Sequence, residues 1–135
     1  MGVKQTIEAA ITRDRAKQLL VELVRVPSPQ TGLFEAEPLL RKFIETAIEP
    51  RLRTMGIADI RYDAMGNLIA GFGADKTGKS LMLIGNAMNQ PQATMKNAYD
   101  GDVADGAQYD LPGEVVLGKG ASEQKANLAA MLHAM

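Results

Sequence analysis

The chain has 135 residues, a formal net charge of −1, no cysteine and a single histidine. This composition excludes disulfides and thiolate metal sites, and the balanced charge offers no basic surface for nucleic acid or an anionic membrane. No apolar run approaches the ~20 residues of a membrane span, and the N-terminus lacks the layout of a signal peptide. The sequence therefore predicts a cytoplasmic protein with no nucleic-acid or membrane partner.

The first predicted element is an amphipathic helix. It starts after Thr12 or Asp14, either of which is a suitable N-cap, and it ends before Pro27 and Pro29 because proline cannot continue a helix. Its apolar stripe consists of Ala16, Leu19, Leu20, Leu23 and Val24.

A second amphipathic helix is predicted from about Glu35 to Thr54. Pro38 is acceptable in its first turn, Pro50 should kink it, and Gly56 is a natural C-terminal stop. Its apolar face consists of Leu39, Leu40, Phe43, Ile44, Ala47 and Ile48.

Short β-type runs follow. Strands are predicted at 59–63, 67–73 and 80–85, with a turn over 64–67 joining the first two. The third run, "SLMLIG", reads as a strand buried on both sides because its apolar residues are consecutive. A further short run, "EVVLG", lies at 114–118.

The stretch from Asn86 to Gly113 is polar and aperiodic, and is predicted to be a loop. Within it, "DGDVADG" resembles a calcium loop, but its spacing is wrong and no glutamate follows at the required position, so we interpret it as a solvated turn. A last helix is predicted from an N-cap at Ser122, with one face formed by Leu128, Met131, Leu132 and Met135. The sequence ends within this apolar stripe, which suggests that further polypeptide completes the fold.

The stretch "GADKTGKS" matches a phosphate-binding P-loop through Gly73, Gly78, Lys79 and Ser80. A P-loop requires a helix directly after it, because the phosphates bind to backbone N–H groups at the N-terminus of that helix. The residues that follow, "LMLIGN", read as a strand. We therefore interpret the stretch as a loop between two strands and predict no nucleotide site.

Four segments occur in one order: "VRVPSPQTG", the second helix, the strand pair "IRYDAMGNLIAGFG", and "LMLIGNAMNQP" followed by "LGKGASEQKANLAAMLHAM". This arrangement resembles the co-catalytic zinc exopeptidases and amidohydrolases, the family of acetylornithine deacetylase, succinyl-diaminopimelate desuccinylase and aminoacylase. The resemblance implies that residues 1–135 are the N-terminal segment of a three-layer α/β catalytic domain. It also implies two zinc ions, and further strands and a second domain that this sequence does not contain.

The residues at the family's metal positions depart from its pattern. The first zinc ligand, a histidine in the family, falls on Asn86, whose amide oxygen is neutral and a poor zinc ligand. The aspartate that orients this histidine falls on Met88, and the bridging aspartate falls on Glu123. Of these positions only Glu123 keeps a carboxylate that could hold a metal. The surrounding matches are Gly85, Pro91, Gly118, Gly120, Ala121 and Lys125.

Each of these side chains also has a plain structural interpretation. Glu123 at the start of a helix is favoured by the helix dipole without any metal. Lys119 and Lys125 are predicted to be solvated charges, and His133 to be structural or exposed.

Two functions follow as hypotheses. In the first, the chain is the N-terminal part or a subunit of a metal-dependent hydrolase that cleaves an amide bond of a small N-acyl amino acid or peptide. Zinc or another divalent ion would be its cofactor, and its catalytic residues would come from another polypeptide or from later sequence. In the second, Asn86 and Met88 mark a non-catalytic subunit or binding module that kept the fold and lost the metals.

Overall fold

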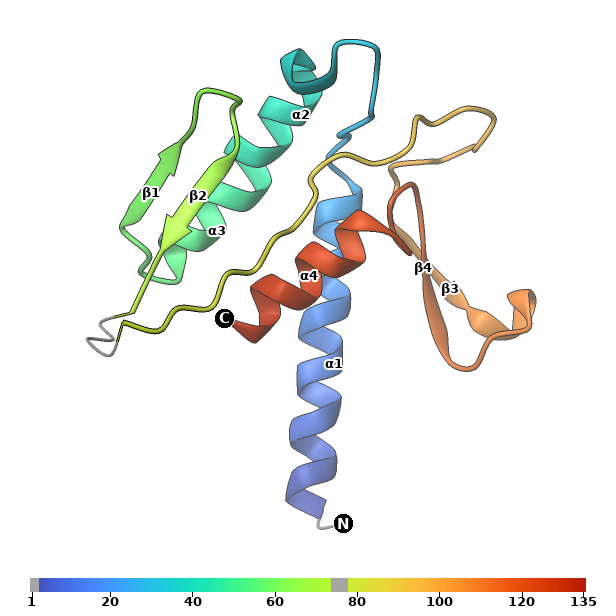
Figure 1. Cartoon of the computed structure of the whole chain (residues 1–135). Helices are drawn as coiled ribbons and strands as arrows, with labels where there is room; N and C mark the ends of the chain where they lie inside the picture. The colour runs from blue at the N-terminus through green and yellow to red at the C-terminus, as the bar shows by residue number, and fades with distance from the viewer. Residues whose placement is uncertain (1–2, 74–77) are drawn as a thin grey trace.

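The computed structural model describes residues 3–73 and 78–135. Its fold is mixed α/β: helices pack together around one apolar core, and two separate two-stranded antiparallel hairpins flank them (Figure 1). The coarse prediction of an α/β protein is confirmed. Within the described part of the chain, no helix is long and apolar enough to cross a membrane.

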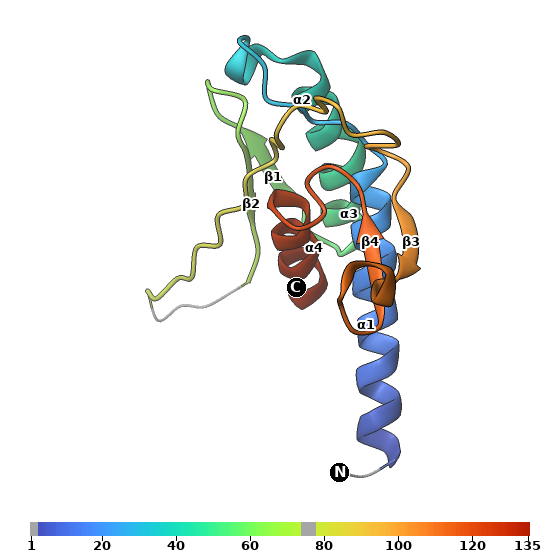
Figure 2. The ribbon, with the colours of Figure 1, turned by 90° about the vertical axis from the view of Figure 1, so that its right-hand side faces the viewer.

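The first helix, α1, spans Val3–Val24 and is longer than predicted. Its end before Pro27 is confirmed, but a start after Thr12 or Asp14 is wrong, because the preceding residues contain no helix breaker and continue the helix. Figures 1 and 2 both show this N-terminal part extending away from the rest of the fold. Leu19, Leu23 and Val24 are buried, as the apolar stripe indicates.

The second predicted helix is a nearly continuous run of three pieces. It consists of α2 at Pro38–Phe43, a wider π-helical turn at Ile44–Ile48, and α3 at Glu49–Thr54. The predicted feature at Pro50 is a kink; the structure has a π-helical turn that ends two residues before this proline, which has no N–H to donate to the turn before it. Gly56 ends the run with a φ of 84° and donates its N–H to Arg53 O at 2.9 Å. Leu39 was expected on the buried face and is exposed.

The hairpin of β1 (Asp59–Tyr62) and β2 (Leu68–Gly71) confirms the first predicted strand pair. Its turn is held by Asp63, whose carboxylate accepts from the N–H groups of Met65 and Asn67, both at 2.9 Å. Hydrogen bonds from Asn67 hold the pKa of Asp63 below its usual value.

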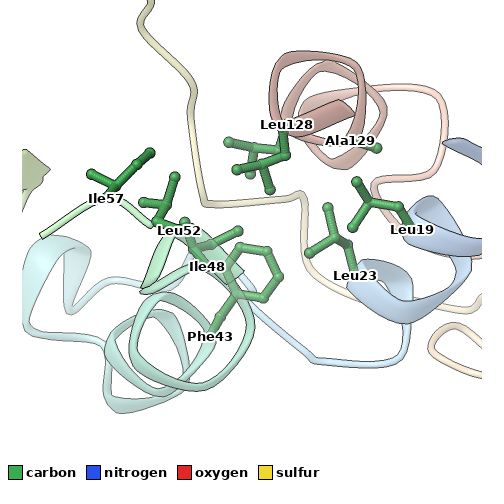
Figure 3. Close-up of a cluster of buried hydrophobic side chains, with 9 residues drawn as sticks. Leu19, Leu23, Phe43, Ile48, Leu52, Ile57, Leu128 and Ala129 are labelled. Carbon is green, nitrogen blue, oxygen red and sulfur yellow. The ribbon is translucent and has the colours of Figure 1, made fainter. Parts of the chain in front are cut away.

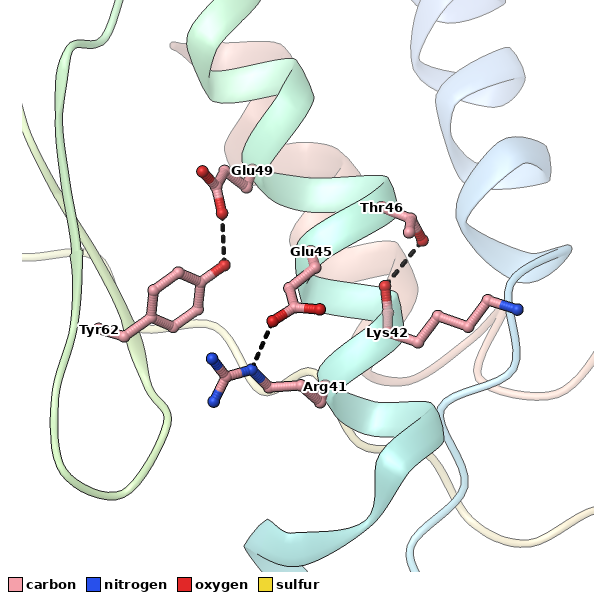
Figure 4. A network of polar contacts seen from close by, with 6 residues as sticks. All are labelled: Arg41, Lys42, Glu45, Thr46, Glu49 and Tyr62. Atoms are coloured by element: carbon pink, nitrogen blue, oxygen red, sulfur yellow. Dashed lines mark hydrogen bonds and ion pairs between the residues drawn. The ribbon is translucent and has the colours of Figure 1, made fainter.

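Polar contacts fasten this hairpin to the second helical run (Figure 4). Tyr62 donates its hydroxyl to Glu49 Oε2 at 2.6 Å, and the Arg41 guanidinium lies 4.9 Å from the centre of the Tyr62 ring while also pairing with Glu45. Burial, reinforced by the Glu49 carboxylate, raises the pKa of Tyr62 to about 12. The neutral phenol is therefore the form that the fold favours.

The second hairpin joins β3 (Asp102–Asp105) to β4 (Glu114–Leu117), with Asp102 opposite Leu117. The prediction of β4 is confirmed. Interpreting "DGDVADG" only as a solvated turn is wrong, because Asp102–Asp105 gains strand structure by pairing with β4. Lys17 of α1 donates to Glu114 at 2.6 Å, and Arg25 donates to Asp100 O at 2.9 Å, so this hairpin lies along α1.

The last helix, α4, spans Gln124–Ala134 and packs against α1. Glu123, rather than the predicted Ser122, occupies its N-cap position. Helices α1 and α4 and the second helical run share one core, in which Phe43 is fully buried (Figure 3). Its buried members are Leu19, Leu23, Phe43, Ile48, Leu52, Ile57, Leu128, Ala129 and Leu132.

Residues 80–85 do not form the predicted strand. The chain from Lys79 to Met88 has neither helix nor strand, and Leu81–Ile84 are exposed. A strand requires a neighbouring strand to satisfy its backbone, and the described residues provide none here. The prediction was based on side-chain pattern alone, which does not supply that neighbour.

Candidate functional site

Three segments that are distant in the sequence meet beside the C-terminal end of α1. They are residues 26–30, residues 87–90, and the turn at 118–125 that leads into α4. The first two run parallel and pair through a single bridge between Pro29 and Asn89. Asn89 donates its N–H to Ser28 O at 2.9 Å, and Gln30 donates its N–H to Asn89 O at 2.8 Å.

Ser28 and Asn89 carry buried polar side chains at this junction, with exposed fractions of 0% and 1%. The Ser28 hydroxyl lies 2.7 Å from Ala87 O and 2.9 Å from Asn89 Oδ1, and its proton can be donated to either. Asn89 Nδ2 donates to Gln90 O at 2.7 Å. Because buried polar groups are costly when unpaired, these bonds determine how the two segments meet.

Lys125 comes to the same junction from α4 and is completely buried. Its ammonium donates to Val26 O at 2.6 Å and also lies 3.5 Å from Val24 O, so it caps the C-terminal end of α1. The rings of Phe43 and Tyr99 lie 5.0 and 5.5 Å from Nζ, within the range of cation–π attraction. The prediction that Lys125 is a solvated charge is wrong.

The charge of Lys125 is held by carbonyls and aromatic rings rather than by a carboxylate. None of the ion pairs among the described residues involves Lys125. Burial lowers its pKa to about 8, because desolvation disfavours the ammonium form. We call Ser28, Asn89 and Lys125 the buried polar cluster.

Two glycines allow the turn at 118–125 to approach Val24 and Asn89 closely. A Cβ on Gly118 would lie 2.3 Å from Val24 Cγ1, and a Cβ on Gly120 would lie 3.0 Å from Asn89 Cβ and 3.2 Å from Lys125 Cγ. Gly120 also has a φ of 83°, which L side chains rarely adopt. The "GKG" sequence therefore lets this turn pack directly against the buried polar cluster.

The positions predicted from the resemblance lie near this junction without forming a joint site. Asn86 is exposed three residues before Asn89, and Met88 is half-buried. Glu123 is exposed three residues after Gly120, and its backbone N–H donates to Gly120 O at 3.1 Å. No hydrogen bond joins the side chains of Asn86 and Glu123.

The side chains at these positions do not fit a pair of zinc ions. They offer one neutral amide, one thioether and one carboxylate, whereas zinc is held by histidine, cysteinate and carboxylate groups. Across residues 3–73 and 78–135, no three histidine, cysteine, aspartate or glutamate side chains come together as a potential metal site. His133 is half-buried on α4.

The P-loop-like stretch lies elsewhere. Ala74 to Thr77 fall outside the described residues, and Gly73, Gly78, Lys79 and Ser80 are exposed. The chain from Lys79 to Met88 has neither helix nor strand, so no helix N-terminus is present there to bind a phosphate.

Sequence reasoning missed Ser28 and Asn89 altogether. The available signal is their place in "VPSP" and "MNQP", two segments that carry the resemblance. Lys125 was noted as a match to the family pattern, but its burial depends on the free carbonyls at the end of α1.

Comparisons with known proteins identify no relative. A scan against protein-family models, a search of curated proteins and a search of solved structures each found no match.

Proposed function

We propose that this chain is the N-terminal part of a three-layer α/β domain similar to the co-catalytic zinc exopeptidases and amidohydrolases, and that it acts there as a non-catalytic scaffold and binding part. One observation carries the proposal. The segments "VRVPSP", "GNAMNQP" and "GKGASEQK", on which the resemblance rests, converge on the buried polar cluster. A chance likeness of scattered motifs would not require them to meet.

The altered side chains support a binding role over a catalytic one. The cluster holds the two loops that carry Asn86 and Glu123, and both of these side chains are exposed. An amide can donate and accept hydrogen bonds, and a carboxylate accepts them, which suits a ligand that contains amide groups. The class of ligand that we propose is therefore a small N-acyl amino acid or peptide, bound with neither zinc nor hydrolysis.

Zinc titration tests this proposal. We expect the purified chain to bind no stoichiometric zinc by calorimetry and elemental analysis. Asn86→His combined with Met88→Asp should bind zinc at least about tenfold more tightly, because it restores a histidine and the carboxylate that orients it. A matched control is Gln92→His with Thr94→Asp, which has the same spacing on an exposed part of the same loop. Stoichiometric zinc in the unaltered chain would contradict the proposal.

A second candidate is hydrolysis by a larger assembly, and one observation favours it. Glu123 places a carboxylate at the position of the family's bridging ligand, exposed at the start of α4. In this case another polypeptide, or sequence beyond this chain, provides the remaining groups. Release of amino acid from N-acyl substrates by the assembly, lost in Glu123→Gln but kept in the exposed control Glu35→Gln, would establish hydrolysis and remove the non-catalytic proposal.

A further inference from the structure

Residues 79–84 form an exposed link between two halves of the fold. The half before the link contains α1, the second helical run and the first hairpin, and the half after it contains the second hairpin and α4. Within the described chain, no backbone–backbone hydrogen bond involves Leu81–Ile84, and all the residues of the link are exposed. The peptide bonds of the link are therefore open to solvent and to an enzyme.

The link has the conformation that an endopeptidase requires. Such an enzyme binds its substrate as an extended strand, so a folded chain is cut where a stretch is free of helix, sheet and bonded turn. The chain from Lys79 to Met88 has neither helix nor strand, and Figure 2 shows the start of this stretch standing clear of the helices. The bond between Leu81 and Met82 has exposed residues of the link on both sides.

The side chains of the link select this bond. Leu81 is 86% exposed and apolar, so it fits the hydrophobic slot with which a chymotrypsin-type enzyme receives the residue before the cut. Gly85 lies against α4, because a Cβ added there would come 2.6 Å from Leu128 Cδ2. Peptide bonds closer to this anchor are less free to enter an active site. The bond between Leu81 and Met82 is thus the most accessible apolar site in the link.

Other exposed apolar side chains belong to bonded backbone. Phe72 directly follows β2, whose residues pair with β1. Phe34 donates its N–H to Thr31 O at 3.2 Å, and Leu111 donates its N–H to Gly106 O at 3.0 Å. A strand or a turn must open before the chain at any of these places can bind as an extended substrate, and this opening costs free energy.

Contacts on both sides of the link hold the two halves together. Leu128, Ala129 and Leu132 of α4 share the apolar core with α1 and the second helical run. Lys125 Nζ donates to Val26 O at 2.6 Å, and the parallel bridge adds two backbone hydrogen bonds across the junction. A cut in the link would break the covalent connection between the halves and none of these contacts.

We propose that the Leu81–Met82 peptide bond is an endoproteolytic processing site for an endopeptidase with an apolar S1 pocket, and that the two products remain together as one folded body. Hydrolysis breaks the C–N bond. The hydroxyl of water joins the carbonyl carbon of Leu81 and its other hydrogen joins the nitrogen of Met82, which gives a carboxylate and an ammonium after ionisation. Both new charges lie in the exposed link. The proposal depends neither on zinc nor on the proposed function.

Limited digestion of the purified chain with chymotrypsin tests the site. We expect the first cut after Leu81, identified by mass spectrometry of the two fragments. Leu81→Asp should slow this cut about tenfold or more, because a carboxylate does not fit the hydrophobic slot. Leu111→Asp is the matched control, at an exposed leucine on bonded backbone, and should leave the first cut unchanged. Slow exchange of the Asn89 amide in each variant verifies that the fold is intact.

Native mass spectrometry of the cut protein tests whether the products stay together. We expect one species with the mass of the intact chain plus one water, which separates into two fragments only in denaturant. A first cut at another bond, or an unchanged rate of this cut in Leu81→Asp, would overturn the assignment of the site. Separation of the fragments without denaturant would overturn the inference that they remain one folded body.

Discussion

Residues 81–84 and residues 87–89 belong to one extended stretch but lie in opposite environments. The first group exposes its apolar side chains and makes no backbone hydrogen bond within the described chain. The second ends at Asn89, which is buried and bonded through both its backbone and its side chain. Order along this stretch comes from distant segments: residues 26–30 and Lys125 complete one end, whereas no described residue bonds the backbone of the other.

Removing Lys125 should break the ordered end and have the largest effect. Lys125→Ala leaves Val26 O without its donor and opens a cavity beside Phe43, so the free energy of unfolding should fall by about 2–4 kcal/mol. Lys125→Met should lose less, because it keeps most of the apolar contacts. Urea denaturation measures both. Lys96→Ala, at an exposed lysine, is the control and should stay within about 0.5 kcal/mol. Equal stability of Lys125→Ala and the unaltered chain would show that Lys125 does not stabilise the fold.

Raising the pH should stabilise the ordered end. Burial lowers the pKa of Lys125 to about 8 from its ordinary value of 10.5. Below pH 8 the lysine is protonated in both states and its desolvation cost is fully present. Between the two pKa values the unfolded chain binds more protons, so stability rises with pH. The unaltered chain should gain up to about 3 kcal/mol relative to Lys125→Met over this range. A pH-independent difference between the two would show that Lys125 does not titrate as described.

Crowding the glycine turn should have an intermediate effect. Gly120→Ala places a Cβ 3.0 Å from Asn89 Cβ on a residue whose φ is 83°, so stability should fall by about 1–3 kcal/mol. Gly32→Ala is the matched control, because nothing lies within 4 Å of its added Cβ and its φ is outside the left-handed region. Thermal unfolding of the two variants provides the comparison. Similar melting temperatures for both would mean that the turn does not pack against Asn89 as described.

Changes in the exposed segment should have the smallest effect on stability. Leu81→Ser removes an apolar side chain that is 86% exposed, so the free energy of unfolding should change by no more than about 0.5 kcal/mol. Leu128→Ser, at a buried leucine of the core, is the contrasting variant and should lose several times more. A large loss in Leu81→Ser would mean that the segment is already packed in the free chain.

Elements whose causes are local could be predicted from the sequence. The end of α1 follows from Pro27, and the turn between β1 and β2 follows from the turn residues at 64–67. The coarse α/β class follows from the same periodicities. In each case the signal and the structure that it specifies lie within a few residues of one another.

Features that depend on distant partners could not be predicted in this way. Strand β3 exists because β4 pairs with it, and residues 80–85 remain unpaired because the described chain offers them no neighbour. Lys125 is buried because the end of α1 supplies free carbonyls and Phe43 supplies a ring. The resemblance points to Asn86 and Glu123, which are exposed, whereas the buried polar side chains at the junction are Ser28, Asn89 and Lys125.

Residue-resolved hydrogen exchange of the free chain tests the central contrast most directly. We expect the amides of Gln30 and Asn89, each bonded across the junction, to exchange about a hundredfold or more slowly than unstructured amides. We expect the amides of 81–84 to exchange at close to unstructured rates at every protein concentration. Slow exchange at 81–84 in the monomer, or rapid exchange at Gln30 and Asn89, would contradict it.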